Sequence, residues 1–153
     1  AADTYTKPEL PEEAEENTER GAEAAAEHYL TLLTYAWNTG DTQPFADMSS
    51  PTSKFANGYI NDIDERYANG WTYGLESKVT QILALKPLDA NDTDIPEGSV
   101  LVKYRIESFD GTTCVNKNTR TSSKHYQSTF TLIMTWSDGR WKETQGRIIS
   151  DNE

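Results

Sequence analysis

The sequence has few of the residues from which active sites and metal sites are most often built. It contains one cysteine, Cys114, and two histidines, His28 and His125, in 153 residues. A single cysteine cannot form a disulfide within the chain, and the histidines lack the spacing of metal ligands. Cys114 lies in a segment rich in Gly, Thr and Asn with no neighbouring base, which argues against a nucleophile. We therefore expect no metal and no cofactor, and we find no catalytic motif in the chain.

Long apolar runs and clustered basic residues are also missing. No run approaches the ~18 consecutive apolar residues that a membrane-spanning helix needs. The net charge is -11, and the lysines and arginines form no stripe along the sequence. Because nucleic-acid binding depends on clustered Lys and Arg at the phosphates, we expect no nucleic-acid partner. The length of 153 residues and the 35% hydrophobic content are those of one globular domain.

Acidic residues are concentrated at the beginning of the chain. Residues 1–27 hold nine acidic side chains against two basic ones. Two prolines, Pro8 and Pro11, accompany them with few apolar residues, a composition typical of an extended, solvated segment. We therefore predict a flexible acidic tether over residues 1–16 and a single domain over residues 17–153. Binding of calcium or of a basic partner by the acidic residues is the alternative.

The clearest element is a long helix after the tether. Asn17 or Thr18 is expected to accept a backbone N–H as N-cap, and Gly40 is expected to follow the helix end, where glycine adopts the left-handed conformation at least cost. Apolar residues recur between these limits with the 3.6-residue period of a helix that buries one face. The predicted buried face consists of Ala22, Ala25, Ala26, Tyr29, Leu32, Leu33 and Ala36.

Two further helices are predicted before residue 70. Asp41 or Thr42 is expected to cap a short helix that runs through Pro44, Phe45 and Met48. The Ser50-Pro51 pair is expected to start a third helix, with proline at its first position. Apolar residues recur every four positions on this helix, at Phe55, Tyr59, Ile63 and Tyr67. Gly70 is expected to end it.

The second half of the chain has the pattern of β-strands. Strands are predicted over residues 75–88, 99–109, 126–136 and 140–149, with alternating apolar and polar residues most evident in the second and third. A loop is predicted over 86–98 and a polar, mobile loop over 112–124, while Ser137-Asp138-Gly139 is typical of a hairpin turn. Three helices followed by a four-stranded antiparallel meander predict an α+β fold with helices on one face of a curved sheet.

This order of elements resembles the nuclear transport factor 2-like (SnoaL-like) cone of ketosteroid isomerases, scytalone dehydratase and many ligand-binding modules. The C-terminal hairpin over residues 131–143, TLIMTWSDGRWKE, is similar to the usual ending of that superfamily. The N-terminal half, above all Pro8–Leu33, resembles a family of uncharacterised actinobacterial lipoproteins. The motifs of that resemblance are Leu10-Pro11-Glu12, Asn17-Thr18-Glu19, Gly21-Ala22-Glu23, His28-Tyr29-Leu30, Leu32–Ala36 and Thr39–Thr42, with Ser49.

The lipoprotein resemblance implies a location and no activity. It implies an extracytoplasmic protein anchored to the cell membrane through a lipid-modified cysteine, which, like the signal peptide, is not in this chain. The acidic segment would then be the spacer from the membrane, and the membrane would be contacted only through this anchor. Members of that family often have a cysteine pair after a turn whose counterpart here, Ser50–Lys54, contains no cysteine.

The candidate pocket lies on the inward face of the predicted sheet. If Trp141 faces inward, the two-residue period of a strand places Glu143, Gln145 and Arg147 on the same side. A carboxylate beside an aromatic wall is what an isomerase of this fold uses as acid or base, together with oxyanion donors. A rim ion pair between Glu143 and Arg147 is the structural alternative. The candidate ligand-binding residues are Tyr104, Tyr126, Phe130, Trp136, Trp141, Glu143 and Gln145.

Three functions are compatible with this pattern. We expect a non-enzymatic module of the cell envelope that binds a small molecule or an envelope protein partner. The first alternative is a cone-fold isomerase or dehydratase that uses Glu143. The second is a structural scaffold that forms a homodimer through the outer face of the sheet.

Overall fold

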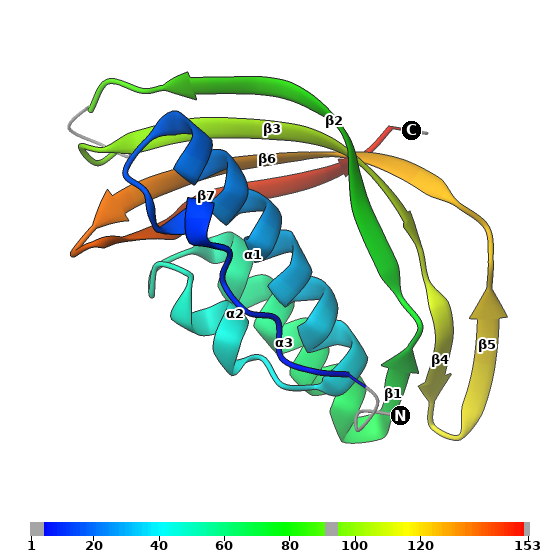
Figure 1. Ribbon diagram of the computed structural model, residues 1–153. Helices are drawn as coiled ribbons and strands as arrows, with labels where there is room; N and C mark the ends of the chain where they lie inside the picture. The colour runs from blue at the N-terminus through cyan, green and yellow to red at the C-terminus, as the bar shows by residue number, and fades with distance from the viewer. Residues whose placement is uncertain (1–4, 91–94, 152–153) are drawn as a thin grey trace.

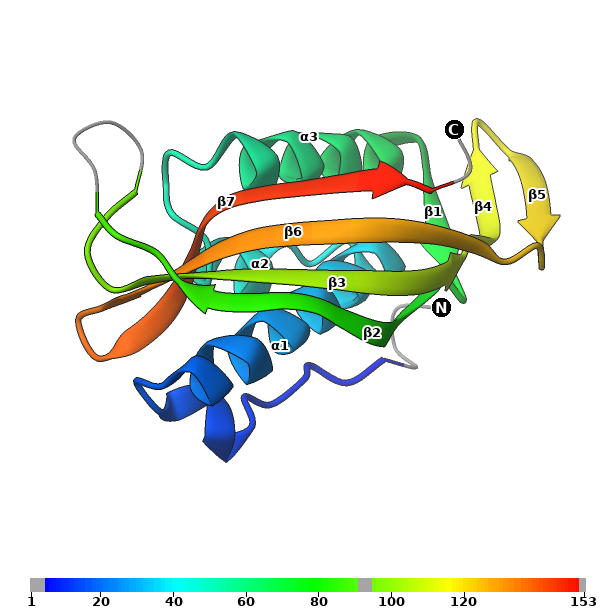
Figure 2. The ribbon, with the colours of Figure 1, turned by 90° about the horizontal axis from the view of Figure 1, so that it is seen from above.

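The computed structural model describes residues 5–90 and 95–151, which form a helical layer under an arched antiparallel sheet. Figures 1 and 2 show α1, α2 and α3 on the concave side of the sheet, with a second, smaller sheet curling away at one end. No helix in the described part of the chain is long and apolar enough to cross a membrane. The helical elements are a 3-10 turn at Glu12–Glu15, α1 at Glu19–Thr39, α2 at Gln43–Asp47 and α3 at Lys54–Asn69.

The predicted long helix is confirmed, including both of its ends. The Thr18 side chain accepts a hydrogen bond from the Gly21 N–H at 2.9 Å and caps the N-terminus of α1. Gly40 follows the helix with φ of +80°, the left-handed conformation expected there. Every residue of the predicted apolar face is buried. The 3.6-residue period therefore identified the face that packs on the sheet.

The start of α3 differs from the prediction by three residues. Ser50 and Pro51 belong to a turn, in which the Ser53 N–H donates to the Ser50 carbonyl at 3.0 Å. Proline at the second position is typical of such a turn. The N-cap is Ser53, whose side chain accepts from the Ala56 N–H at 3.0 Å. From the sequence alone, Ser50 and Ser53 could each be the N-cap of this helix. Because Ser50 belongs to the turn, the helix begins after Ser53.

The predicted four-stranded antiparallel sheet is confirmed. Its order is β2-β3-β6-β7, so each strand pairs with its neighbours by antiparallel registers. The β6–β7 turn has Asp138 at φ +54° and Gly139 at φ +81°, the conformation favoured in two-residue hairpins. Lys86 and Pro87 fall in the overlap of the strand predicted over 75–88 and the loop predicted over 86–98, and they belong to β2; residues 91–94 of that loop lie outside the described residues. The strands are β2 Glu76–Pro87, β3 Ser99–Phe109, β6 Tyr126–Ser137 and β7 Arg140–Ser150.

The mobile loop predicted over 112–124 is wrong, because most of it forms a hairpin in a second sheet. The strands β1 Gly70–Tyr73, β4 Gly111–Val115 and β5 Asn118–Ser122 form a three-stranded sheet in the order β1-β4-β5. The hairpin turn is made by Asn116 and Lys117, both with positive φ. Threonine and valine favour strands. This short segment is ordered because β1, which follows α3 directly, supplies a pairing edge.

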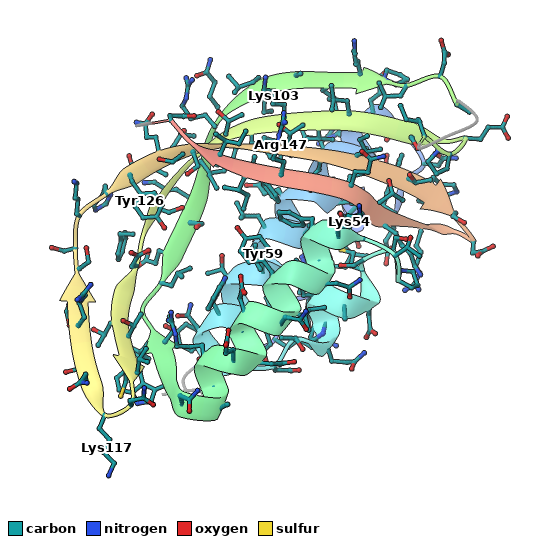
Figure 3. The ribbon with its side chains drawn as sticks, turned by 180° about the vertical axis from the view of Figure 1, so that it is seen from behind. Lys54, Tyr59, Lys103, Lys117, Tyr126 and Arg147 are labelled. Atoms are coloured by element: carbon teal, nitrogen blue, oxygen red, sulfur yellow. The ribbon has the colours of Figure 1, made fainter. Side chains whose placement is uncertain are left out.

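A bulge in β7 overturns part of the predicted pocket. Ile133 pairs with Gln145 and Met134 with Glu143, so Thr144 is an extra, unpaired residue of β7. The side chains that follow it therefore lie on the opposite face of the sheet from the one that a strict two-residue period predicts. The prediction that Gln145 and Arg147 share a face with Glu143 is therefore wrong. Both are exposed, and Arg147 is labelled in Figure 3. Gly146 and Ile148 face inward instead, as their contacts with the core show.

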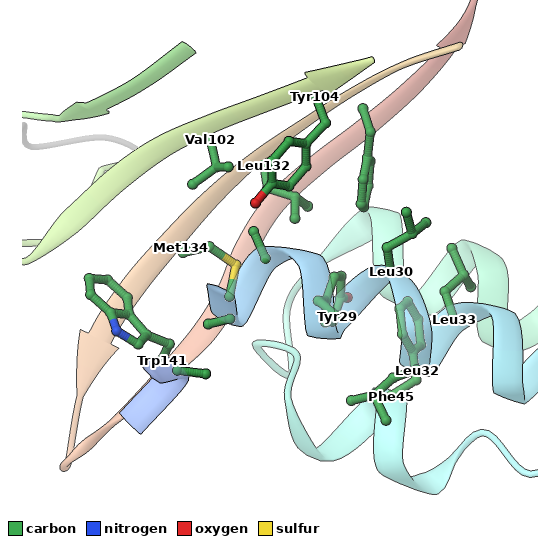
Figure 4. Close-up of a cluster of buried hydrophobic side chains, with 14 of the residues drawn as sticks. Tyr29, Leu30, Leu32, Leu33, Phe45, Val102, Tyr104, Leu132, Met134 and Trp141 are labelled. Atoms are coloured by element: carbon green, nitrogen blue, oxygen red, sulfur yellow. The ribbon is translucent and has the colours of Figure 1, made fainter. Parts of the chain in front are cut away.

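The core lies between α1 and the concave face of the sheet. The predicted alternation of β3 is confirmed, with Val100, Val102, Tyr104 and Ile106 all buried. Figure 4 shows side chains of α1, among them Tyr29, opposite side chains of β3, β6 and β7. The buried members from β6 and β7 are Phe130, Leu132, Met134 and Trp141.

The acidic N-terminal segment contacts the domain at both ends of its described part. The Tyr5 hydroxyl accepts from the Gly74 N–H at 2.9 Å, and its ring lies edge-on to Tyr73. Ala14 in the 3-10 turn is buried, and the Glu16 carbonyl accepts from the Trp141 indole N–H at 2.7 Å. Leu10, between these points, is 41% exposed. A tether function for residues 1–16 stays a prediction.

The junction between α3 and the second sheet generates a test. A Cβ at Gly70 would lie 1.7 Å from the Cys114 carbonyl oxygen, so Gly70→Ala must push β1 away from β4. We expect a loss of about 1–3 kcal/mol in the free energy of unfolding. The matched control is Gly58→Ala within exposed α3, where a Cβ meets nothing within 4 Å. It should gain about 0.5–1 kcal/mol. Denaturant unfolding measures both, and equal effects would contradict the close pairing.

Candidate functional site

A cavity opens where the two sheets diverge. It has a volume of about 390 Å³ and lies between α1, α3, the ends of β3 and β6, and the second sheet. Figure 3 shows Tyr59 on α3 and Tyr126 on β6, which both line it. A volume of several hundred Å³ is typical of small-molecule sites.

Small residues on the sheet leave this space unfilled. Successive inward positions of β3 are Tyr104, Ile106 and Ser108, and the inward position of β6 before Phe130 is Ser128. Both serines are buried and line the cavity. The cone is filled where aromatic side chains of the sheet face the helices, and it is open where Ser108 and Ser128 face them. The apolar walls are formed by Leu30, Leu33, Trp37, Leu75, Ile106 and Ile148.

Charged and polar groups line the rest of the cavity. The Tyr126 hydroxyl donates to Asp110 Oδ1 at 2.8 Å. Burial raises the pKa of Tyr126, and the neighbouring Asp110 carboxylate adds to the increase. Two arginines also line the cavity, Arg66 from α3 and Arg120 from β5. An apolar wall with a few convergent polar groups can hold an amphipathic molecule in one orientation.

Of the seven candidate residues, Tyr126 is the one that lines this cavity. Four of the others, Tyr104, Phe130, Trp136 and Trp141, belong to the core or pack against it, and the centres of the two tryptophan rings are 5.5 Å apart. The Tyr104 hydroxyl donates to the Glu23 carbonyl. Gln145 lines a second pocket, of about 500 Å³, beside Ser50, Thr52, Lys54, Phe55, Pro96, Thr144 and Gly146.

Glu143 lies in neither cavity, although it is completely buried. Its carboxylate accepts from the Ser53 hydroxyl at 2.7 Å and from the Tyr29 hydroxyl at 3.1 Å. Ser49, 2.7 Å from the same tyrosine oxygen, completes the network. The Glu143 backbone pairs with the segment that connects α2 to α3: its N–H donates to the Met48 carbonyl at 2.9 Å, and its carbonyl accepts from the Ser50 N–H. This arrangement joins β7 to the α2–α3 connection and leaves no carboxylate oxygen open to a substrate.

Burial raises the pKa of Glu143, and the hydrogen bonds from Ser53 and Tyr29 offset part of the increase. Among the residues that the structure describes, no group of three or more His, Cys, Asp or Glu side chains is arranged to hold a metal ion. The sequence signal for the open cavity is the pair of serines, Ser108 and Ser128, at inward strand positions, and neither arginine carries a local sequence signal of its own.

The raised pKa of Glu143 predicts a pH-dependent stability. A proton binds this carboxyl more tightly in the folded state, so its contribution is full below about pH 4.5 and is lost as pH rises through the raised folded pKa. The free energy of unfolding of the wild type, minus that of Glu143→Gln, should therefore decrease as the pH is raised from acidic to neutral.

Urea unfolding at a series of pH values measures this difference. Glu76→Gln, the same substitution at an exposed position that begins β2, is the control, and its difference should change less with pH than that of Glu143→Gln. A pH-independent difference for Glu143→Gln would show that its burial does not favour the protonated form.

Solved structures of the same fold were found at low sequence identity. The intermembrane space region of the chloroplast protein ARC6 is 15% identical with a TM-score of 0.58, covering 88% of this chain and 98% of that one. A protein with a cystatin-like fold from Caulobacter vibrioides is 12% identical with a TM-score of 0.53, covering 85% and 89%. A "Putative Scytalone Dehydratase" from Novosphingobium aromaticivorans is 11% identical with a TM-score of 0.52, covering 82% and 81%.

These similarities show the fold alone, a mixed α+β cone of the nuclear transport factor 2-like and scytalone dehydratase-like kind. The second sheet goes beyond the three helices and four strands that the sequence predicted. No curated protein matches the chain in sequence. A family model described as "Family of unknown function (DUF6318)" matches residues 1–146, and the chain therefore belongs to that family.

Proposed function

We propose that this protein binds a small amphipathic organic molecule in the cavity between the two sheets. The observation that carries the proposal is the open cavity of about 390 Å³, which has apolar walls on α1 and the main sheet and polar groups on α3 and the second sheet. A domain of this size normally fills its interior to the density of a crystal. Here serines stand at two buried positions that face the cavity, so the space is built into the sheet.

Binding without turnover fits the placement of the acidic groups better than catalysis. Glu143, the carboxylate of the isomerase alternative, is buried outside the cavity with both oxygens hydrogen-bonded. The second candidate function is acid–base catalysis by the Asp110–Tyr126 pair, because these two groups are hydrogen-bonded within the cavity. Turnover that disappears in Tyr126→Phe, with ligand affinity unchanged, would favour this candidate.

Location and assembly are part of the proposal. We place the protein outside the cytoplasm on a lipid anchor, supported by the resemblance of Pro8–Leu33 to actinobacterial lipoproteins. Lipid labelling and fractionation of the full gene product test this location. A homodimer through the outer sheet face is supported by Ile149, which is 48% exposed on β7. Sedimentation of the wild type and of Ile149→Glu tests this assembly, and a monomeric wild type would exclude it.

The binding proposal predicts that filling the cavity abolishes binding. Ser128→Leu adds an apolar side chain at a buried position that lines the cavity. The neutral dye N-phenyl-1-naphthylamine, whose fluorescence increases in apolar sites, is the probe. We expect the wild type to bind it and Ser128→Leu to lose at least about tenfold in affinity, equivalent to about 1.4 kcal/mol.

The control is Gln127→Leu, one position earlier on β6, where the side chain is exposed and outside the cavity. It should bind the dye as the wild type does. A wild type that binds no dye, or two variants that bind equally well, would overturn the proposal.

A further inference from the structure

We propose that the molecule bound in this cavity is a monoanion, an apolar body with a carboxylate held between Arg66 and Arg120. This inference rests on the proposed function and adds the class of ligand. It is carried by two arginines, one from α3 and one from β5, that line the same cavity and form no ion pair with a carboxylate of the described residues.

Two contacts fix the position of the Arg66 side chain at the cavity. One guanidinium N–H donates to the Thr72 hydroxyl at 2.8 Å, and Cζ lies 5.5 Å from the centre of the Trp37 ring. The side chain is half-buried, and no Asp or Glu of the described residues lies within 4 Å of it. Charged groups removed from water normally acquire a partner of opposite charge. Arg66 has five N–H donors and one hydrogen-bond acceptor among the described residues, so it can offer the remaining donors to the cavity.

Arg120 reaches the same cavity from the second sheet. It lies on β5 opposite Thr113 of β4, and both residues line the cavity. Arg120 also forms no ion pair with the described residues. The two arginines therefore belong to elements far apart in sequence, α3 and the β4–β5 hairpin. A ligand between them would join the hairpin to the helical layer.

The balance of charge favours a monoanion. Among the described residues, Asp110 is the one carboxylate that lines the cavity, and it accepts from Tyr126. Two guanidinium groups against one carboxylate leave a single positive charge, in a chain whose net charge is -11. A carboxylate neutralises this charge, whereas a phosphate dianion would exceed it. Guanidinium groups also match the two oxygens of a carboxylate in geometry.

The test uses two ligands of the same shape, 1-naphthaleneacetate and the neutral 1-naphthaleneethanol, in calorimetric titrations at pH 7. The acid is expected to bind the wild type at least about tenfold more tightly than the alcohol, as charged hydrogen bonds predict. Arg120→Gln should remove most of this preference without changing the affinity for the alcohol. Lys117→Gln, at the tip of the same hairpin (Figure 3), loses the same charge outside the cavity and should bind both ligands as the wild type does.

Arg66 is tested with two variants because it also contacts Trp37 and Thr72. Arg66→Gln should lose the preference for the acid, and Arg66→Lys, which keeps the charge, should retain a part of it. Equal binding of acid and alcohol would overturn the anion inference and leave the binding proposal intact. Displacement of the acid by inorganic phosphate at equal concentration would assign a phosphate ligand instead. If neither ligand nor the neutral dye binds, the proposed function itself fails.

Discussion

The buried carboxylate of Glu143 is the interaction on which the arrangement of the layers depends. A carboxyl group removed from solvent is tolerated only where hydrogen bonds replace those to water. Here the donors are Tyr29 in the middle of α1 and Ser53 at the start of α3, while the carboxylate belongs to β7. Ser53 also caps α3, so one hydroxyl serves both the helix end and the carboxylate. The positions of both helices relative to the sheet are thus coupled at one point.

This coupling explains why the cone is closed at one end and open at the other. On the side of Glu143, the rings of Phe45, Tyr29 and Trp141 are buried and the helical layer lies close to the sheet. At the opposite end, the sheet presents serines and the wall is completed by another sheet. The interior is therefore not uniform: rigid packing and buried hydrogen bonds stabilise one end, while the other retains a space that water or a ligand can occupy.

Much of the fold followed from the sequence because its signals are local. The α1 face, the Thr18 and Gly40 caps and the β3 alternation depend on residues within one element, and the structure confirmed them. The β7 bulge depends on the pairing with β6, so a strict two-residue period predicts the wrong face for Gln145. The pairing of β1 with β4 joins segments distant in sequence, so the Thr-rich residues 112–124 have the local pattern of a loop although most of them form strands. Glu143 was expected to be inward and is, but its hydrogen-bond partners lie 90 and 114 residues away. The sequence does not predict the cavity, because serines at two inward strand positions give no distinctive pattern.

Among the described residues the two sheets share no strand pairing; the chain passes between them at Gly74–Leu75, at Asp110 and around residues 123–125, and the β1 edge is the continuation of α3. Substitutions on the exposed β5 strand therefore need not disturb the opposite end of the cone, where the hydrophobic core is packed. Chains built on this plan can acquire new preferences for what they hold by altering five residues, Asn118–Ser122, while inheriting the rest of the architecture unchanged.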